Sequence, residues 1–144
     1  MADTASAALH ATRHDDGGKL LLRVAVGVLM LLHGLFKLGN GIGGITGMVQ
    51  GAGLPPVLAY GVYVGEVLAP VLMIIGLWTR PAALVVAINM VVAIALAHGK
   101  QLFSLTQQGG WALELQGLYL FGALAVALLG AGRYSVGGLH GRFN

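Results

Sequence analysis

The fold class of this 144-residue chain is decided by residues 57–97, which read VLAYGVYVGEVLAPVLMIIGLW (57–78), TRP (79–81) and AALVVAINMVVAIALA (82–97). A helix of about 20 residues crosses the roughly 30 Å hydrocarbon core of a bilayer. Backbone polar groups must be paired within such a segment, which favours helices over strands. We therefore expect two transmembrane helices in an antiparallel hairpin, the second extended through His98 to reach sufficient length.

Two further apolar runs, residues 20–38 and 111–131, are also long enough to span a bilayer. The first begins late and lacks an Ala-x-Ala cleavage site, so we interpret it as a retained span and not as a signal peptide. The sequence therefore predicts an all-α fold, a membrane-embedded bundle of four transmembrane helices at about 20–38, 57–78, 82–98 and 111–131. This domain (19–136) lies between a flexible cytoplasmic tail at 1–18 and a short cytoplasmic tail at 137–144.

The composition supports a membrane protein. Hydrophobic residues make up 57% of the chain and charged residues only 9%. A soluble domain carries about 25% charged residues, so this surface suits lipid rather than water. The basic residues lie at the ends of apolar runs and form no stripe, which argues against nucleic-acid binding. The chain has no cysteine, which excludes disulfides, a CxxC redox pair and thiolate-bound metal centres.

The basic residues also predict an orientation, because Lys and Arg favour the cytoplasmic side of a membrane. If the N-terminus, the turn at 79–81 and the C-terminus share one side, that side holds six basic residues. The opposite side then holds only two, Lys37 and Lys100. We therefore predict a multi-pass protein of the bacterial cytoplasmic (inner) membrane with both termini in the cytoplasm.

The loop at 39–56 would lie on the outer side. It is rich in glycine, yet apolar residues recur in it at helical spacing: Ile42, Ile45, Met48/Val49 and Ala52. This pattern predicts a short interfacial helix between the first and second spans.

Polar side chains within the spans are costly in lipid, so each requires a partner or a function. The informative ones are His33, Lys37, Glu66, Asn89, His98, Glu114 and Gln116. All except Asn89 gather in the predicted outer half, and this clustering is the main functional signal. We predict catalytic roles for His33, Lys37, Glu66 and His98, and cofactor-binding roles for Tyr63, Asn89 and Glu114. Gln116 points away from Glu114 and is interpreted as structural or interfacial.

The surroundings of Glu66 predict an irregular helix. Pro70 lacks the N–H group that would bond the Glu66 carbonyl, so we expect a kink with a free carbonyl at this carboxylate. Gly61 and Gly65 are four residues apart and should let another helix approach closely on a neighbouring face.

Several of these residues also have a structural interpretation. Glu66 and Lys37 can pair and merely hold helices together, and Lys37 can instead extend to the lipid headgroups. Glu114, one turn inside its helix, can interact with the helix dipole. His98 and Asn89 lie about 180° apart on an ideal helix, so both face the bundle centre only if the helix end unwinds.

Three motifs do not support the functions they suggest. The GxGxxG pattern at 39–44 follows a transmembrane helix and not a strand, so no nucleotide site is predicted. His10 and His14 have metal-ligand spacing but lie in the predicted tail, so no metal site is predicted. His33 and His98 both lie near the outer face, yet the facing of His98 argues against a haem pair.

The order of these features resembles the DoxX family of four-helix bacterial membrane proteins over residues 20–136. The matching pieces are His33-Gly34-x-x-Lys37, Gly53-Leu54-Pro55, Glu66, Gly76-Leu77-x-Thr79-Arg80-Pro81-Ala82-Ala83 and His98. The family pattern often ends in Ser-Leu-Asp, whereas Ser135-Val136-Gly137 lacks the acid. The family includes small subunits of thiosulfate–quinone oxidoreductases and of other membrane redox assemblies, so the resemblance implies a redox context.

The combined interpretation is a small membrane subunit of a redox system that handles a quinone or a small reduced substrate near the outer face. If it takes part in catalysis, it belongs to a quinone-linked oxidoreductase and is not a complete enzyme. The lipid bilayer, a protein that supplies electrons and a second copy of the chain are the expected partners. The alternatives are a non-catalytic anchor or assembly subunit and, less favoured, a small-solute or proton transporter.

The predicted orientation can be tested with single cysteines in this cysteine-free chain. In Ala7→Cys and Ser135→Cys, the thiol should resist a membrane-impermeant reagent added outside intact cells. In Ser104→Cys it should react. Reaction of Ala7→Cys from outside would reverse the orientation.

Overall fold

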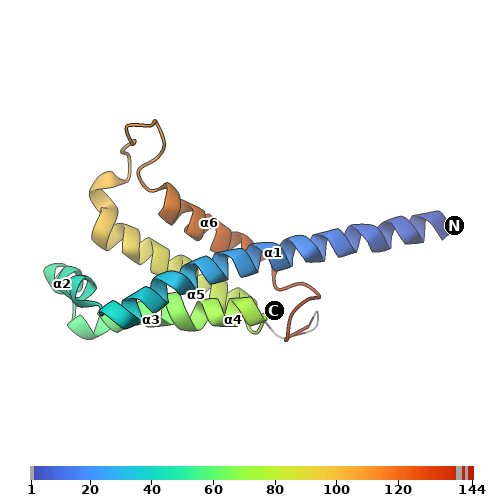
Figure 1. The fold of residues 1–144 in the computed structure, drawn as a ribbon, viewed down its shortest axis with the longest axis horizontal. Coiled ribbons are helices and arrows are strands. Elements are labelled where there is room, and N and C mark those ends of the chain that lie inside the picture. Colours follow the sequence, from blue (N-terminus) through green and yellow to red (C-terminus); the bar gives the residue numbers. More distant parts are fainter. Residues whose placement is uncertain (1, 139–140, 142) are drawn as a thin grey trace.

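The computed structural model describes residues 2–138, 141 and 143–144, with side chains from residue 14 onward (Figure 1). Helix α1 (Ala2–Asn40) is followed by the short α2 (Gly43–Gly51). The second helical stretch combines the 3-10 turn η1 (Pro56–Tyr60), α3 (Gly61–Tyr63), the π-helical turn η2 (Val64–Leu68) and α4 (Ala69–Ile75). The third combines α5 (Thr79–Ala93), the π-helical turn η3 (Ile94–His98) and the 3-10 turn η4 (Gly99–Gln101), and α6 (Glu114–Leu129) comes last.

The predicted all-α fold class is confirmed for the described residues, in which no strand occurs. Three helices are long and apolar enough to cross a membrane, namely His14–Asn40, Pro56–Ile75 and Thr79–Gln101. They coincide with the first three predicted spans. The fourth apolar helix, α6, has 16 residues and is shorter than the predicted run at 111–131. Its role as a fourth span therefore stays a prediction.

The ends of these helices follow from local chemistry. The second stretch stops at Ile75 because Gly76 adopts a left-handed conformation (φ 73°), which ends helices and favours glycine. Helix α5 starts earlier than predicted, at Thr79, since Pro81 is tolerated in a first helical turn. Helix α6 starts later than predicted because Trp111 forms an isolated antiparallel bridge with Leu105 and so belongs to the preceding loop.

The predicted N-terminal tail at 1–18 has a helical backbone from Ala2 onward, continuous with the first span (Figure 1). Its sequence is rich in alanine and contains no proline, which favours helix. The flexibility expected of this segment stays a prediction.

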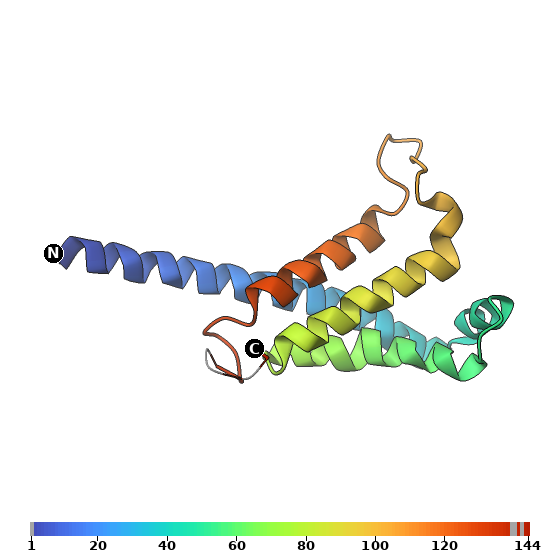
Figure 2. The same cartoon turned by 180° about the vertical axis from the view of Figure 1, so that it is seen from behind.

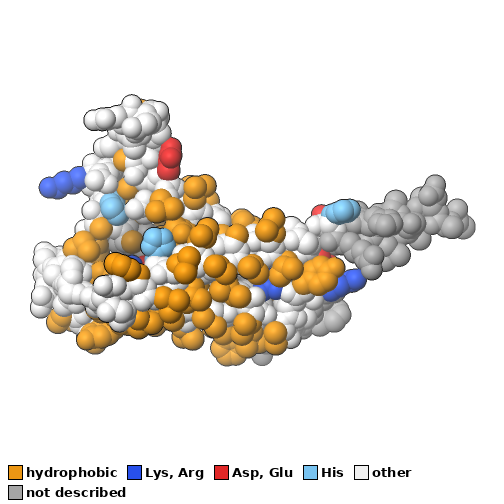
Figure 3. All heavy atoms as spheres, in the orientation of Figure 1, with side chains coloured by type: hydrophobic (Ala, Val, Ile, Leu, Met, Phe, Trp, Pro, Cys, Tyr) orange, Lys and Arg blue, Asp and Glu red, His pale blue; other side chains and the backbone are white. Residues whose placement is uncertain are grey.

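The core lies where α1, α4, α5 and α6 meet. Small side chains on α5 and α6 allow these helices to approach closely, and Ala83 and Ala123 are fully buried. Leu118, Phe121 and Leu128 are exposed instead, and Figure 3 shows such apolar side chains spread over the body of the bundle. An apolar outer surface of this kind is typical of a protein that lies in lipid. Figure 2 shows α5 and α6 diverging toward the loop that joins them.

Arg23 joins the helices at the end of the bundle where α4 is followed by α5, opposite the loop between α5 and α6. Its side chain is only 1% exposed. The guanidinium donates to the carbonyls of Met73 (2.7 Å) and Ile74 (2.6 Å) in the last turn of α4, and to those of Ala131 and Tyr134 beyond α6. Carbonyls at a helix C-terminus have no partner within the helix and carry partial negative charge, so a buried cation suits them.

Val136 and the described part of the predicted C-terminal tail (137–144) pack against the same end. The N–H groups of Val136 and Gly137 donate to the carbonyls of Ile75 and Gly76, at 3.1 and 3.0 Å. The Thr79 hydroxyl donates to the Asn144 side-chain carbonyl at 2.9 Å. These contacts seal the hairpin turn between α4 and α5.

We expect Arg23→Met to lower the free energy of unfolding by roughly 3 kcal/mol, because hydrogen bonds to a charged group contribute about 1.5–3 kcal/mol each. Thermal unfolding in detergent, followed by circular dichroism, measures the loss. The matched control is Arg133→Met, since that side chain is 51% exposed and its guanidinium lies 3.9 Å from Asp16. An exposed pair of this kind contributes under about 1 kcal/mol. Equal losses in the two variants would contradict the anchoring role of Arg23.

Candidate functional site: a buried ion pair between two cavities

The candidate site is built on an ion pair between α1 and the π-helical turn η2. The Lys37 ammonium donates to both carboxylate oxygens of Glu66, at 2.5 and 2.6 Å. The Glu66 side chain is 4% exposed and that of Lys37 is 28% exposed. Lys37 therefore lies at the edge of the bundle and reaches inward to a buried carboxylate. This contact agrees with the structural interpretation of the two residues and excludes extension of Lys37 to the headgroups in this structure.

Helix α1 can approach Glu66 because residue 34 is glycine. A Cβ atom on Gly34 would overlap with the Glu66 carbonyl oxygen and would lie 2.7 Å from a Val67 methyl carbon. The Glu66 carbonyl has no α-helical donor since Pro70 occupies the position four residues later. A π-helical turn occurs at 64–68, and π-turns of this kind occur frequently at functional sites. The predicted kink with a free carbonyl stays a prediction.

Asn89 joins the ion pair from α5. Its amide donates to a Glu66 carboxylate oxygen at 3.3 Å. This approach requires Gly65, because a Cβ atom there would lie 2.6 Å from the Asn89 Cβ. The predicted close helix contact is thus present at Gly65, whereas nothing lies within 4 Å of a Cβ placed on Gly61.

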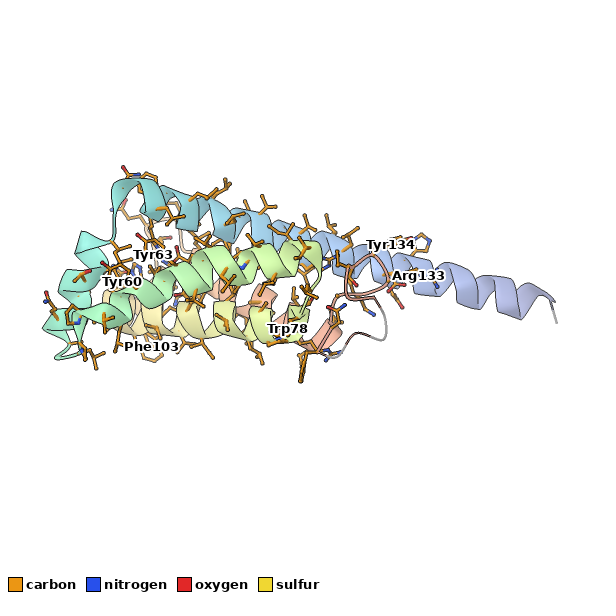
Figure 4. All side chains as sticks on the ribbon, turned by 90° about the horizontal axis from the view of Figure 1, so that it is seen from below. Tyr60, Tyr63, Trp78, Phe103, Arg133 and Tyr134 are labelled. Atoms are coloured by element: carbon orange, nitrogen blue, oxygen red, sulfur yellow. The ribbon has the colours of Figure 1, made fainter. Side chains whose placement is uncertain are left out.

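Tyr63 supports Lys37 from the second stretch. Tyr63 lies one helical turn before Glu66, and its hydroxyl donates to the Lys37 backbone carbonyl at 3.4 Å. Figure 4 shows Tyr63 beside Tyr60 at the end of the bundle near α2, and the two rings are 6.2 Å apart.

His98 reaches the site because the end of the third stretch changes its helical type. The π-helical turn at 94–98 is wider than an α-helical turn, so it rotates the helix face on which His98 lies. His98 and Asn89 therefore line the same cavity. The sequence predicts that both face the bundle centre only if the regular α-helix ends before His98. The His98 Nδ1 atom lies 3.1 Å from the Gln101 side-chain oxygen, and Nε2 lies 3.2 Å from the Gln116 amide nitrogen. Both ring nitrogens of His98 therefore lie within hydrogen-bond distance of a side-chain amide.

His33 and Glu114 occupy different surroundings. The His33 ring packs edge-on against Tyr119, with ring centroids 5.7 Å apart. Glu114 is exposed and accepts the Trp111 N–H at 3.0 Å, a local bond at the start of α6. Of the two cavities described next, His33 lines the smaller one together with Lys37 and Glu66, whereas Glu114 lines neither.

Two cavities meet at the ion pair. The larger, of about 740 Å³, lies between α2, the second helical stretch and α5. The smaller, of about 160 Å³, lies between α1, η3 and α6. Both are lined by four common residues, Lys37, Glu66, Ala93 and His98. In Figure 3, pale-blue histidine side chains lie at this end of the molecule.

The predicted short helix forms one wall of the larger cavity. Ile42 and Val49 of this segment are buried against Ala59 and Val62 at the start of the second stretch. Ile45, Met48 and Val49 face the cavity. The helical spacing of its apolar residues thus predicts the helix, while its position at the membrane interface stays a prediction.

Sequence reasoning interpreted Gln116 as structural or interfacial and missed Tyr119, and both residues line the smaller cavity. They are three residues apart and therefore share a face of α6. That spacing is a usable signal, since a polar residue followed by a tyrosine on one face of an apolar helix suggests a polar surface within the bundle.

The comparisons with known proteins agree with this picture. Residues 18–99 match the model of the DoxX family.

The chain belongs to the DoxX family.

The matched segment contains the ion pair, Asn89 and His98, while Gln116 and Tyr119 lie beyond it. A protein of Bacillus subtilis (strain 168) with the name "Putative oxidoreductase CatD" is 32% identical over 103 residues, or 72% of this chain and 76% of that protein. An "Uncharacterized protein" of Haemophilus influenzae (strain ATCC 51907 / DSM 11121 / KW20 / Rd) is 33% identical over 115 residues, or 74% of this chain and 84% of that protein. No solved structure matches the chain significantly. Family membership and the apolar helices together identify a multi-pass membrane protein.

Proposed function

We propose that this DoxX family protein is a membrane redox subunit that binds a quinone head group in the larger cavity beside the Lys37–Glu66 pair. The electrons come from a partner redox protein, and side chains of this chain supply the protons. Reduction of a quinone to a quinol takes up two electrons and two protons, so the site needs a source of electrons and a source of protons. The observation that carries the proposal is an apolar cavity of about 740 Å³ that ends on a buried, hydrogen-bonded carboxylate.

The wall of this cavity suits a quinone. Only four of its twenty lining residues have polar side chains, and these are Lys37, Glu66, Asn89 and His98. A quinone has a flat apolar ring, an apolar tail and two carbonyl oxygens. Small-molecule sites combine an apolar wall with a few convergent polar groups in this way. The ammonium of Lys37 and the amide of Asn89 can donate hydrogen bonds to carbonyl oxygens.

Glu66 is the group that we assign to proton transfer. A carboxyl group exchanges protons with a bound oxygen when it lies within hydrogen-bond distance. Lys37 and Asn89 stabilise the ionised carboxylate left after the proton has moved. The name of the Bacillus subtilis relative supports a redox context and nothing more detailed.

The proposal includes the arrangement in the membrane. Helix α6 serves as the fourth span, both termini lie in the cytoplasm of a bacterium, and the two cavities open toward the outer side of the inner membrane. The six-to-two distribution of basic residues supports this arrangement.

A second candidate, a non-catalytic anchor, is favoured by the ion pair itself. A buried, bidentate pair holds two helices together whether or not the protein binds a quinone. Removing one partner of such a pair leaves an uncompensated buried charge, which is strongly destabilising.

Quinone binding is tested by filling the larger cavity. Ile88 lines it, so we expect Ile88→Trp to weaken binding of decylubiquinone by about 10-fold or more, because an indole ring occupies the space. Equilibrium dialysis in detergent measures the dissociation constant. Leu128→Trp is the matched control, since Leu128 is 78% exposed and lines neither cavity. Absence of saturable binding to the wild-type protein would refute the quinone proposal.

The role of Glu66 is tested by Glu66→Gln, which keeps the size of the side chain but loses the exchangeable proton. We expect quinone-linked dye reduction in membranes to fall by roughly 10²-fold, the usual scale for a proton-transfer group. Lys37→Met and Glu66→Gln should each lower thermal stability in detergent, and the double variant should recover much of the loss. Unchanged dye reduction in Glu66→Gln, together with that recovery, would leave the anchor as the function.

A further inference from the structure

We propose that the smaller cavity is a water-filled passage that carries protons from the surface near His33 to the Glu66 carboxylate. This inference rests on the proposed function in one respect only, namely that the proton is delivered to a bound quinone. The passage and the larger cavity both border Glu66, and the passage is the polar one of the two.

The smaller cavity differs from the larger one in its chemistry. Six of its ten lining residues have polar side chains: His33, Lys37, Glu66, His98, Gln116 and Tyr119. In the larger cavity the share is four of twenty. Water enters a cavity that is roomy and offers several polar partners, whereas apolar cavities stay dry. A volume of about 160 Å³ accommodates about five water molecules at the roughly 30 Å³ that each occupies in the liquid.

The Tyr119 hydroxyl gives independent support. It makes no hydrogen bond to the described residues, although Tyr119 is only 8% exposed. Among those residues no fully buried polar side-chain atom lacks a partner, so this hydroxyl must border open space. The space available to it is the smaller cavity. A tyrosine hydroxyl that faces a polar cavity without a protein partner is a ready binding site for water.

The entrance and the end of the passage are both defined. His33 lies one helical turn before Lys37, toward the predicted outer end of the first span, and its exposed side chain also lines the cavity. Glu66 is buried and lines both cavities. The other titratable groups that face Glu66 are Lys37 on α1, His98 on η3 and Tyr119 on α6.

The proton balance is simple. A hydronium ion in the passage gives its proton to a Glu66 carboxylate oxygen and becomes water. The carboxylic acid then transfers that proton to an acceptor oxygen in the larger cavity, which regenerates the carboxylate. No electron moves through this chain in either step.

The test measures access of water to the smaller cavity without any ligand. Met90 lines this cavity only and is 6% exposed, and Met73 is 0% exposed and lines neither cavity. In the cysteine-free chain, Met90→Cys and Met73→Cys each place one thiol at a buried position. Silver ion is the probe, because it travels with water and binds thiolates. We expect Met90→Cys to react at least 10-fold faster than Met73→Cys, at matched helicity by circular dichroism.

A second variant lowers the polarity of the passage while nearly keeping its volume. Adding Gln116→Met and Tyr119→Phe to Met90→Cys should slow the silver reaction by about 10-fold, since a less polar cavity loses water. If Met90→Cys does not fold, Met30→Cys on α1 replaces it, since Met30 also lines only the smaller cavity and is 1% exposed. Equal rates at positions 90 and 73, or an unchanged rate after the two polar groups are removed, would overturn the passage. Failure of the wild-type protein to bind decylubiquinone would instead refute the proposed function and leave this result standing.

Discussion

The buried carboxylate of Glu66 is the constraint around which the α2 end of the molecule is arranged. An ionised group at this depth is costly in an apolar interior unless a cation and hydrogen-bond donors compensate it. Lys37 supplies the cation from α1 and Asn89 supplies a donor from α5, so one side chain ties three helical stretches together. Helix α1 approaches Glu66 at Gly34, and α5 approaches at Gly65. A Cβ atom at Gly34 would overlap with the Glu66 carbonyl, and one at Gly65 would overlap with the Asn89 side chain.

The two π-helical turns, η2 and η3, make this convergence geometrically feasible. Glu66 lies in the first and His98 ends the second. On uninterrupted α-helices, Asn89 and His98 would point in opposite directions. The wider turn before His98 changes its facing, so that both residues line the larger cavity. The local irregularity of each helix therefore occurs at the residue that carries the candidate chemistry, as is frequent for π-turns.

The sequence predicts the helical fold and the short helix in the glycine-rich loop, because each depends on local spacing. It leaves the pairing of Lys37 with Glu66 open as one of two interpretations, since a charge in lipid requires a partner or a function. It does not reveal Arg23, which on composition alone looks like a cytoplasmic charge at the end of an apolar run. Its four carbonyl partners come from residues about 50 to 110 positions away. The grouping of Tyr119 with His33 likewise depends on how α6 packs, which hydrophobic periodicity does not specify.

The two ends of the bundle also differ in how they are held. Near the turn between α4 and α5, backbone carbonyls bind Arg23, and the C-terminal segment covers the hairpin. At the other end α5 and α6 diverge, and the ion pair replaces such a network (Figure 2). Since protonation of Glu66 would remove the negative charge that attracts Lys37, any proton that reaches this carboxylate must also weaken the contact between α1 and η2. Proton uptake and helix packing at this end therefore depend on the same pair of atoms and cannot vary independently.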